Sequence, residues 1–279
     1  MKDPLKKQLI KSYRSLSSPL RMLPDFIIVG AQKCGTGSLF HYLKKHPNIS
    51  PSVVKEIQFF GNNFHKGILW YKSFFPSLIR KYYYKYILNQ NLISGEASPF
   101  YIIHPRAIKM IAATIPNVKL ILLLRNPVDR AYSHYHHSVR RGCETLNFED
   151  AIEKEKERIN EEYDKMLKNE MNISSSFAAY SYLMRGKYIN QVERIFHYIP
   201  RKRVLIIKSE NFFEDPPKEL QKVFSFLNVS PYKLSKYKTY GYHGYNKMNE
   251  KTRQYLIGYF KPFNYRLYEY LGVNFNWDK

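Results

Sequence analysis

A short apolar run that ends in a glycine-rich turn constrains this chain more than any other feature. Residues 26–29 read Phe-Ile-Ile-Val, and Gly-Ala-Gln-Lys-Cys-Gly-Thr-Gly-Ser follows at 30–38. Such runs are typical of buried parallel strands, and a helix is expected after the turn, through about His46. Backbone N–H groups in a turn of this kind converge on an anion, and the helix N-terminus adds positive potential. The segment therefore predicts a phosphate- or sulfate-binding loop.

The residue types inside the turn favour an anion bound by protein groups without a metal ion. Gly35 and Gly37 let the backbone approach a ligand closely, and the hydroxyls of Thr36 and Ser38 can donate to it. The Walker pattern requires a lysine and then Ser or Thr after its last glycine. Here Thr36 and Gly37 follow Gly35, and Lys33 lies inside the turn. From the turn alone, a purely structural glycine-rich turn is the alternative.

A second buried strand, at 119–124, runs directly into a cationic motif. A nucleoside triphosphatase needs a carboxylate for Mg²⁺ at the end of such a strand, but this one is followed by Arg125. An arginine can bind a phosphate through two parallel hydrogen bonds. Pro127 suits the first turn of the next helix, and on that helix Ser133 shares a face with Arg130. The motif predicts a second anion contact near the turn.

Further apolar runs complete the pattern of an α/β protein. We expect two more strands and four more helices, at 92–95, 204–207, 149–171, 187–198, 217–227 and 249–271. Pro262 should interrupt or bend the last helix, and Asn147 is a candidate cap for the first. Strands that alternate with helices predict a mostly parallel sheet covered on both faces, with ligands beyond the carboxyl ends of the strands. Residues 1–24 are read as a basic extension and residues 25–279 as a single domain.

The charge balance favours anionic ligands. Lys plus Arg is 45 and Asp plus Glu is 23, which gives a net charge of +22. A field of this sign concentrates anions near clefts, so an anionic cofactor, a nucleic acid or an anionic polysaccharide would suit it. Two cysteines, Cys34 and Cys143, are too few for a disulfide framework. No apolar run in residues 1–24 is long enough for a membrane span or a signal peptide. For a complete chain we therefore expect a cytoplasmic protein without a membrane span.

Taken together, these segments closely resemble the sulfotransferase family, within it the carbohydrate branch of heparan sulfate and chondroitin sulfotransferases and their bacterial relatives. The resemblance covers residues 25–278. Its matching stretches are 26–36, 55–60 (Lys-Glu-Ile-Gln-Phe-Phe), 66–71, 95–99 (Gly-Glu-Ala-Ser-Pro), 124–135, 185–188 and 263–278. It implies the sulfotransferase fold, a P-loop-like parallel sheet with helices on both faces. It also implies sulfuryl transfer from 3′-phosphoadenosine 5′-phosphosulfate to a hydroxyl, with a glycan or glycolipid favoured as the acceptor.

The resemblance implies roles for individual positions. The 5′-phosphosulfate would be bound by the turn, at Lys33, Cys34, Gly35, Thr36, Gly37 and Ser38. Arg125 and Ser133 resemble the ligands of the 3′-phosphate. Glu56 matches the general base of the heparan sulfate 3-O-sulfotransferases, and Lys33 matches the lysine near the bridging oxygen of the donor. Lys55 and Gln58 are candidate acceptor contacts, and no metal site is expected.

Three stretches depart from the heparan sulfate enzymes. Gln58 stands where those enzymes carry a histidine, and Ala97 stands where they carry a lysine. Glu96 is a rival for the role of base, because it follows a strand end inside a matched motif. The family's C-terminal cofactor loop has its nearest counterpart at residues 240–244.

Two other classes of function also fit parts of the sequence. A P-loop kinase or ATPase would share the turn, although the Walker lysine and a strand-end aspartate are missing. A nucleic-acid-binding protein would share the charge of +22, although no recognition motif is present. An anionic acceptor would suit a basic rim near the matched motifs, for which the candidates are Lys55, Lys66, Arg140, Arg141 and Lys187.

Overall fold

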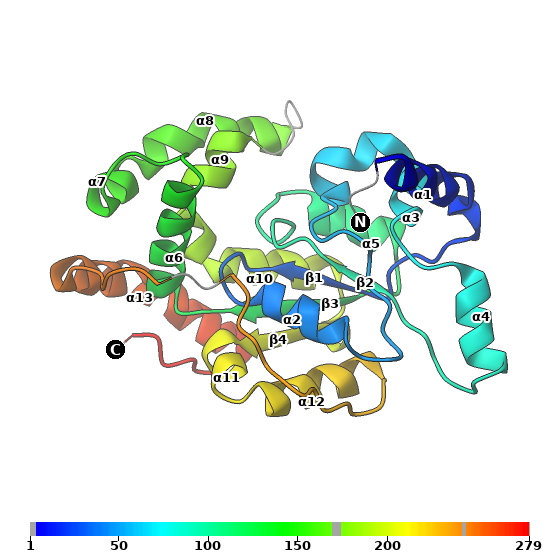
Figure 1. Cartoon of the computed structure of the whole chain (residues 1–279). Coiled ribbons are helices and arrows are strands. Elements are labelled where there is room, and N and C mark those ends of the chain that lie inside the picture. Colours follow the sequence, from blue (N-terminus) through cyan, green and yellow to red (C-terminus); the bar gives the residue numbers. More distant parts are fainter. Residues whose placement is uncertain (1–3, 169–173, 242–243, 279) are drawn as a thin grey trace.

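A four-stranded parallel sheet forms the centre of the computed structural model, which describes residues 4–168, 174–241 and 244–278. Its strands are β1 (Phe26–Gly30), β2 (Gly95–Ala97), β3 (Lys119–Leu124) and β4 (Val204–Lys208). They pair in the order β2-β1-β3-β4, each pair parallel. Every residue of β1 is buried, as is typical of parallel strands covered on both faces. Helices flank the sheet on both faces (Figure 1), so the predicted fold class is confirmed.

Helices connect the strands and build the rest of the molecule. The longer ones are α1 (Pro4–Leu16), α2 (Thr36–Leu43), α4 (Leu78–Tyr86), α5 (Ala107–Thr114), α6 (Pro127–Arg140), α8 (Glu155–Lys168), α10 (Tyr188–Tyr198), α12 (Pro216–Leu227) and α13 (Glu250–Leu271). The shorter ones are α3 (Gly67–Lys72), α7 (Phe148–Glu153), α9 (Ser175–Tyr180) and α11 (Ser209–Glu214). The main apolar core surrounds the sheet, and a smaller one joins α6, α7 and α13. Within the described ranges, none of the helices has both the length and the apolar composition needed to cross a membrane.

The strand expected at 92–95 is misplaced, because β2 begins where that prediction ends. Ile93 bonds to a loop instead of to β1: its N–H donates to the Asn48 carbonyl at 3.0 Å, and its carbonyl accepts from Ser50 N at 2.9 Å. Pairing with β1 starts only at Gly95, opposite Phe26. Local apolarity indicated a buried extended segment but not the neighbour with which it pairs.

Several helix boundaries also differ from expectation. The helix after the turn ends at Leu43, three residues before His46. The charged segment 149–171 is two helices, α7 and α8, which meet at Lys154, and residues 169–171 lie outside the described part of the chain. Asn147 does cap α7, since its side chain accepts from Asp150 N. The α13 helix continues past Pro262, so it is not interrupted there, and the alternative of a bend at Pro262 stays a prediction.

The basic N-terminal stretch packs on the segment that precedes α4. Arg14 donates from Nε to the Ser73 carbonyl at 2.7 Å and from Nη2 to the Phe75 carbonyl at 2.8 Å. Arg21 also donates to the Phe75 carbonyl, at 2.8 Å. Two guanidinium groups therefore satisfy backbone carbonyls of residues 73–75 and hold α1 against the domain.

Gly95 should be required for the pairing of β2 with β1. A Cβ atom at Gly95 would lie 2.4 Å from the Phe26 ring, whereas at Gly258, on the exposed side of α13, it would meet nothing within 4 Å. Gly95→Ala should therefore cost about 1–3 kcal/mol of unfolding free energy through overpacking. Gly258→Ala should gain up to about 1 kcal/mol from helix propensity. Urea unfolding measures both, and equal effects would contradict the packing argument.

Candidate active site

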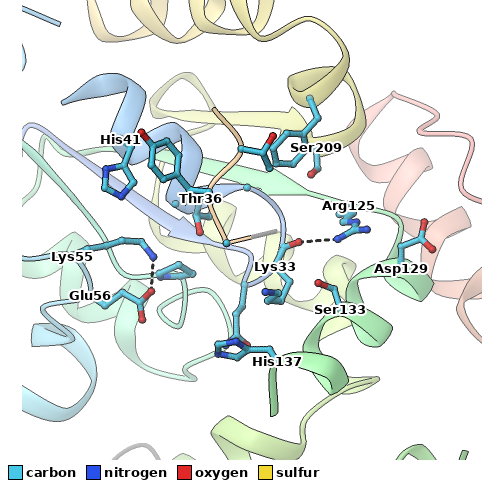
Figure 2. A pocket seen from close by; sticks show the side chains of 18 of the residues that line it. Lys33, Thr36, His41, Lys55, Glu56, Arg125, Asp129, Ser133, His137 and Ser209 are labelled. Atoms are coloured by element: carbon cyan, nitrogen blue, oxygen red, sulfur yellow. Dashed lines mark hydrogen bonds and ion pairs between the residues drawn. The ribbon is translucent and has the colours of Figure 1, made fainter. Parts of the chain in front are cut away.

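A cavity of about 880 Å³ lies beyond the carboxyl ends of the four strands (Figure 2). One or more lining residues follow each strand: Lys33 after β1, Pro99 after β2, Arg125 after β3 and Ser209 after β4. Parallel strands bring their carboxyl ends to one edge of a sheet, where open α/β sheets bind ligands. The location expected from the sequence is confirmed.

The glycine-rich turn forms one wall of this cavity. Gly35 has φ +96° and precedes the first residue of α2. A Cβ atom at Gly35 would lie 2.9 Å from the Phe213 ring, so both the backbone angle and the space favour glycine there. The first N–H groups of an α-helix have no partner inside the helix. Those of Thr36 and Gly37 are therefore available at the start of α2, where the helix dipole also favours an anion.

Lys33 is the lysine of the turn and is held in an uncommon backbone conformation, with φ +69°. Its carbonyl accepts a hydrogen bond from Arg125 Nη1 at 3.4 Å, which ties the turn to the end of β3. Burial, together with the positive charges of Arg140 and Arg125, lowers the pKa of Lys33 to about 8. The site therefore concentrates positive charge at a cost that a bound anion would relieve.

Arg125 and Ser133 face the same cavity from the β3–α6 junction. Arg125 is fixed through its carbonyl, which accepts from the Tyr188 hydroxyl at 3.0 Å. Asn126 caps α6 by accepting from Val128 N, and its own N–H donates to Glu210 Oε1 at 2.8 Å. Figure 2 shows Ser133 and Lys33 close below Arg125, with Lys55 and Glu56 at the other side of the pocket. The turn with Lys33 and the β3–α6 junction with Arg125 are thus two cationic regions that face the same cavity.

Glu56 lies at the open side of the cavity and forms an ion pair with its neighbour. Lys55 Nζ lies 2.7 Å from Glu56 Oε1, and the two side chains are about one third and one half exposed. The Glu56 N–H donates to the Ala97 carbonyl at 2.9 Å, which fixes the residue beside the end of β2. Glu56 has φ +62°, a conformation that non-glycine residues seldom adopt. The backbone therefore directs this carboxylate toward the cavity.

Glu96, the rival base, has a different environment. Its side chain is fully buried, and it is not among the residues that line the cavity. Three hydroxyls donate to it, from Tyr71 at 2.5 Å, Ser98 at 2.8 Å and Tyr101 at 3.2 Å. Burial raises the pKa of Glu96 to about 7, against the opposing effect of the three hydroxyls. An acceptor in the cavity could not reach this carboxylate.

The structure brings most of the expected site residues together. The cavity lining includes eight of them, at Lys33, Gly35, Thr36, Gly37, Lys55, Glu56, Arg125 and Ser133. Cys34 and Ser38 are fully buried behind the turn, and burial raises the pKa of the Cys34 thiol to about 11. Gln58 is outside the lining, and its Oε1 is buried without a hydrogen bond among the described residues. The roles of all these residues stay predictions.

Two of the five residues expected at a basic rim lie elsewhere. Lys55, Arg140 and Arg141 line the cavity. Lys66 Nζ instead lies 4.7 Å from the centre of the Trp70 ring. Lys187 Nζ lies 4.9 Å from the centre of the Phe263 ring. Proximity in sequence to a matched motif did not determine the direction in which these side chains point.

Sequence reasoning missed two histidines and an aromatic residue of the cavity wall, which are His41, His137 and Tyr240. His41 stacks on Tyr240 with ring centres 4.2 Å apart, and Tyr240 N donates to Ser38 Oγ at 2.9 Å, so a distant loop covers the start of α2. His137 lies four residues after Ser133 on α6 and lines the cavity too. Burial, with the charges of nearby Lys33, Arg141 and Arg140, lowers its pKa to about 4. His41 lies four residues after Gly37, and His137 lies four residues after Ser133. This helical spacing could have indicated that both histidines face the cavity.

The acidic groups at the cavity, apart from Glu56, are engaged in holding the fold. Asp129 is paired with Arg253. Glu210 accepts from Asn126 N and from Trp277 Nε1. Among the described residues, no cluster of three or more His, Cys, Asp or Glu side chains could hold a metal ion. The groups offered to a ligand are mainly cations, N–H donors and hydroxyls.

A parallel sheet, a glycine-rich turn before a helix and two cationic regions at one cavity define an α/β protein that binds an anionic ligand. The family model described as the sulfotransferase domain matches residues 23–256. The chain belongs to the sulfotransferase family, and it is a sulfotransferase enzyme.

Similar proteins include a solved structure and longer curated relatives. The crystal structure of a sulfotransferase from Alicyclobacillus acidocaldarius has 30% sequence identity and a TM-score of 0.71, and the match covers 92% of this chain and 100% of that one. The membrane-associated sulfotransferase kil1 of Dictyostelium discoideum is 28% identical over 93% of this chain and 67% of its own length. The bifunctional heparan sulfate N-deacetylase/N-sulfotransferase 1 of Caenorhabditis briggsae is 27% identical over 93% of this chain, which spans only 31% of that protein.

The pKa of Lys33 predicts how anion binding depends on pH. Only the protonated amine attracts an anion, so sulfate, which does not titrate near neutrality, should bind more weakly as the pH rises through about 8. One lost charged contact corresponds to roughly tenfold in affinity. Bound sulfate should also move the midpoint above 8, because it favours the protonated form. Calorimetric titration at several pH values measures both effects.

Lys33→Met should remove this pH dependence. Lys66→Met is the matched control, since Lys66 lies over Trp70 outside the cavity lining. A wild-type affinity that does not change across this pH range would contradict the assignment of Lys33 as an anion contact.

Proposed function

We propose that this enzyme transfers a sulfuryl group from 3′-phosphoadenosine 5′-phosphosulfate to a hydroxyl of a glycan. The observation that carries the proposal is that one cavity is lined by four residues of the turn together with three others: Lys33, Gly35, Thr36, Gly37, Glu56, Arg125 and Ser133. The donor has anionic groups at both its 5′ and 3′ positions, so it requires two separate cationic regions. The turn with Lys33 suits the 5′-phosphosulfate, and Arg125 with Ser133 suits the 3′-phosphate. Phe213 and Tyr240 offer aromatic faces for the purine.

The proposed reaction is an in-line displacement at sulfur. Glu56 takes the proton of the acceptor hydroxyl as the new oxygen–sulfur bond forms. The bond between sulfur and the bridging oxygen breaks, and its electron pair stays on the 5′-phosphate. Lys33 and the N–H groups at the start of α2 stabilise the charge on this leaving oxygen. The products are the sulfate ester and adenosine 3′,5′-bisphosphate, and the reaction is expected to need no divalent metal.

The surroundings of Glu56 favour a hydrophilic, anionic acceptor. Lys55, Arg140 and Arg141 line the cavity together with Glu56, and they would attract an acidic polysaccharide. The Caenorhabditis briggsae relative is named for heparan sulfate, which agrees with a glycan acceptor. Incubation with the sulfated donor and a panel of acidic glycans, neutral glycans, glycolipids and small alcohols tests the proposal, with the product identified by mass. A product formed only from small alcohols would overturn the choice of a glycan.

Loss of Arg125 should weaken ligands that carry a 3′-phosphate. A charge-assisted hydrogen bond is worth about 1.5–3 kcal/mol, so Arg125→Ala should weaken adenosine 3′,5′-bisphosphate by that amount in calorimetric titration. Adenosine 5′-monophosphate should bind the variant and the wild type equally well. Equal weakening of both ligands would show that Arg125 does not contact the 3′-phosphate.

The two candidate bases should separate in a pair of matched substitutions. Glu56→Gln keeps the size of the side chain but removes the proton acceptor, so kcat should fall by roughly 10²–10⁴ while donor affinity hardly changes. Glu96→Gln should lower the unfolding free energy, since Glu96 accepts three buried hydroxyl hydrogen bonds, but it should retain kcat. The reverse pattern, with turnover abolished in folded Glu96→Gln and retained in Glu56→Gln, would reassign the base.

A further inference from the structure

Helix α4 turns an apolar stripe away from the body of the protein. Ile79, Tyr82, Tyr83 and Tyr86 follow the spacing i, i+3, i+4, i+7, which puts them on one side of a helix. Each of these side chains is between 51% and 70% exposed. Single exposed apolar residues are ordinary, whereas a continuous exposed stripe indicates an interaction surface.

The other side of α4 contacts the domain through Leu78, which packs against the main core, and through two polar side chains. Arg80 Nη1 donates to Ser50 Oγ at 3.2 Å, and the Tyr84 hydroxyl donates to the Pro47 carbonyl at 3.4 Å. The helix is therefore held to the domain by Leu78 together with these polar groups. The larger apolar stripe is left uncovered.

Helix α1 repeats this orientation. Leu9, Tyr13 and Leu16 follow the spacing i, i+4, i+7 and are 64% to 85% exposed. Arg14, on another side of the helix, is the residue that bonds to the carbonyls of Ser73 and Phe75. Both helices lie at the end of the molecule opposite α13 (Figure 1). They meet the same connecting segment, since the backbone of Arg21 after α1 pairs with that of Ser77 before α4.

The chain between the two helices carries further exposed apolar residues. Leu20, after α1, is 59% exposed, and Ile68 and Leu69 of α3 are also exposed. We call α1, α3, α4 and Leu20 the N-terminal face. Cations of these helices include Lys11, Lys72, Lys81 and Lys85, and Lys66 directly precedes α3. The chain between Pro4 and Gly95 has only two acidic residues, Asp25 and Glu56, and neither lies on the three helices.

We propose that the N-terminal face lies on the surface of an anionic lipid bilayer. Interfacial helices combine a lipid-facing apolar stripe with lysine and arginine beside it, and each cation near an anionic leaflet adds to the attraction. Tyrosine suits the level of the headgroups, where its ring is apolar and its hydroxyl stays hydrated. Lysine can reach the headgroups while its stem stays in apolar surroundings.

Composition favours lipid over the other possible occupants of this face. A second copy of the chain would bring two basic, acid-poor faces together, which charge repulsion disfavours. A nucleic acid or acidic glycan would use the cations and the tyrosine rings but would gain little from Leu9, Leu16, Leu20, Ile68, Leu69 and Ile79. The surface therefore fits a partner that is both apolar and anionic. This inference is independent of the donor and acceptor proposed above.

Vesicle sedimentation tests the proposal. The full chain should bind vesicles of phosphatidylcholine mixed with phosphatidylserine at least tenfold more tightly than vesicles of phosphatidylcholine alone. Raising the salt from about 0.1 M to about 1 M should weaken this binding, because the Debye length falls from about 10 Å to about 3 Å. The triple variants Leu9→Ser/Tyr13→Ser/Leu16→Ser and Ile79→Ser/Tyr82→Ser/Tyr86→Ser should each weaken it at least tenfold.

A matched control removes exposed apolar side chains from the other end of the molecule. Tyr255→Ser/Tyr265→Ser/Val273→Ser changes three residues that are 52% to 64% exposed, and it should bind vesicles like the wild type. Thermal unfolding and binding of adenosine 3′,5′-bisphosphate check that every variant is folded. Equal binding to both kinds of vesicle, or equal losses in the control, would overturn the proposal. The proposal would also be overturned if the wild type bound no vesicles and instead formed a dimer in sedimentation equilibrium that both stripe variants abolish. A second copy of the chain would then cover this face.

Discussion

The pairing of β1 with β3 is the constraint on which the site depends. The two strands run parallel, with Gly30 opposite Leu122, and Ala31 N donates to the Leu123 carbonyl at 2.8 Å. The glycine-rich turn and the β3–α6 junction therefore leave the sheet at adjacent points and on the same edge. The bond from Arg125 to the Lys33 carbonyl continues this connection beyond the strands. Lys33 and Arg125, which are about ninety residues apart in the sequence, thus line one cavity.

The clustering of cations at one cavity has an electrostatic cost. Lys33, Arg125, Arg140 and Arg141 line one cavity, while two of its three carboxylates bond to other parts of the fold. The lowered pKa of Lys33 reflects both its burial and its positive neighbours. The positive charges of this site are poorly balanced by its own carboxylates, and an anionic ligand would supply the missing negative charge. The net charge of +22 acts in the same direction over a longer range.

The parts of the site that follow directly from strand ends could be predicted from the sequence. A buried run followed by glycines locates Lys33, and a buried run followed by arginine locates Arg125, because both inferences need only local pattern and parallel topology. The wall formed by Tyr240 could not be predicted, because it depends on a loop some two hundred residues from Ser38 that closes over α2. The start of β2 was missed for a similar reason, because an apolar sequence indicates a buried segment but not the strand with which it pairs. The acceptor and the cellular location stay predictions.

Only the three-dimensional structure distinguishes Glu56 from Glu96 as the candidate catalytic base. Both carboxylates lie near the end of β2 and inside matched motifs, so sequence position does not distinguish them. Burial does, because Glu96 is enclosed by hydroxyls from three residues while Glu56 faces the cavity. The two are nevertheless connected. Ser98 donates to Glu96 and its Oγ also accepts from Gln58 N, and the Ala97 carbonyl accepts from Glu56 N.

Glu96 thereby helps to hold the backbone that presents Glu56. Glu56 and Gln58 both have positive φ values, at 62° and 54°, and conformations of this kind persist only where the surrounding structure enforces them. The hydrogen bonds from Glu56 N to Ala97 and from Gln58 N to Ser98 are the contacts that enforce them here, and Glu96 fixes Ser98. Glu96 is too deeply buried to take a proton from an acceptor, and its part here is to hold Ser98 by accepting a hydrogen bond. An amide oxygen at position 96 could accept the same bond, so this structural part is separate from proton transfer.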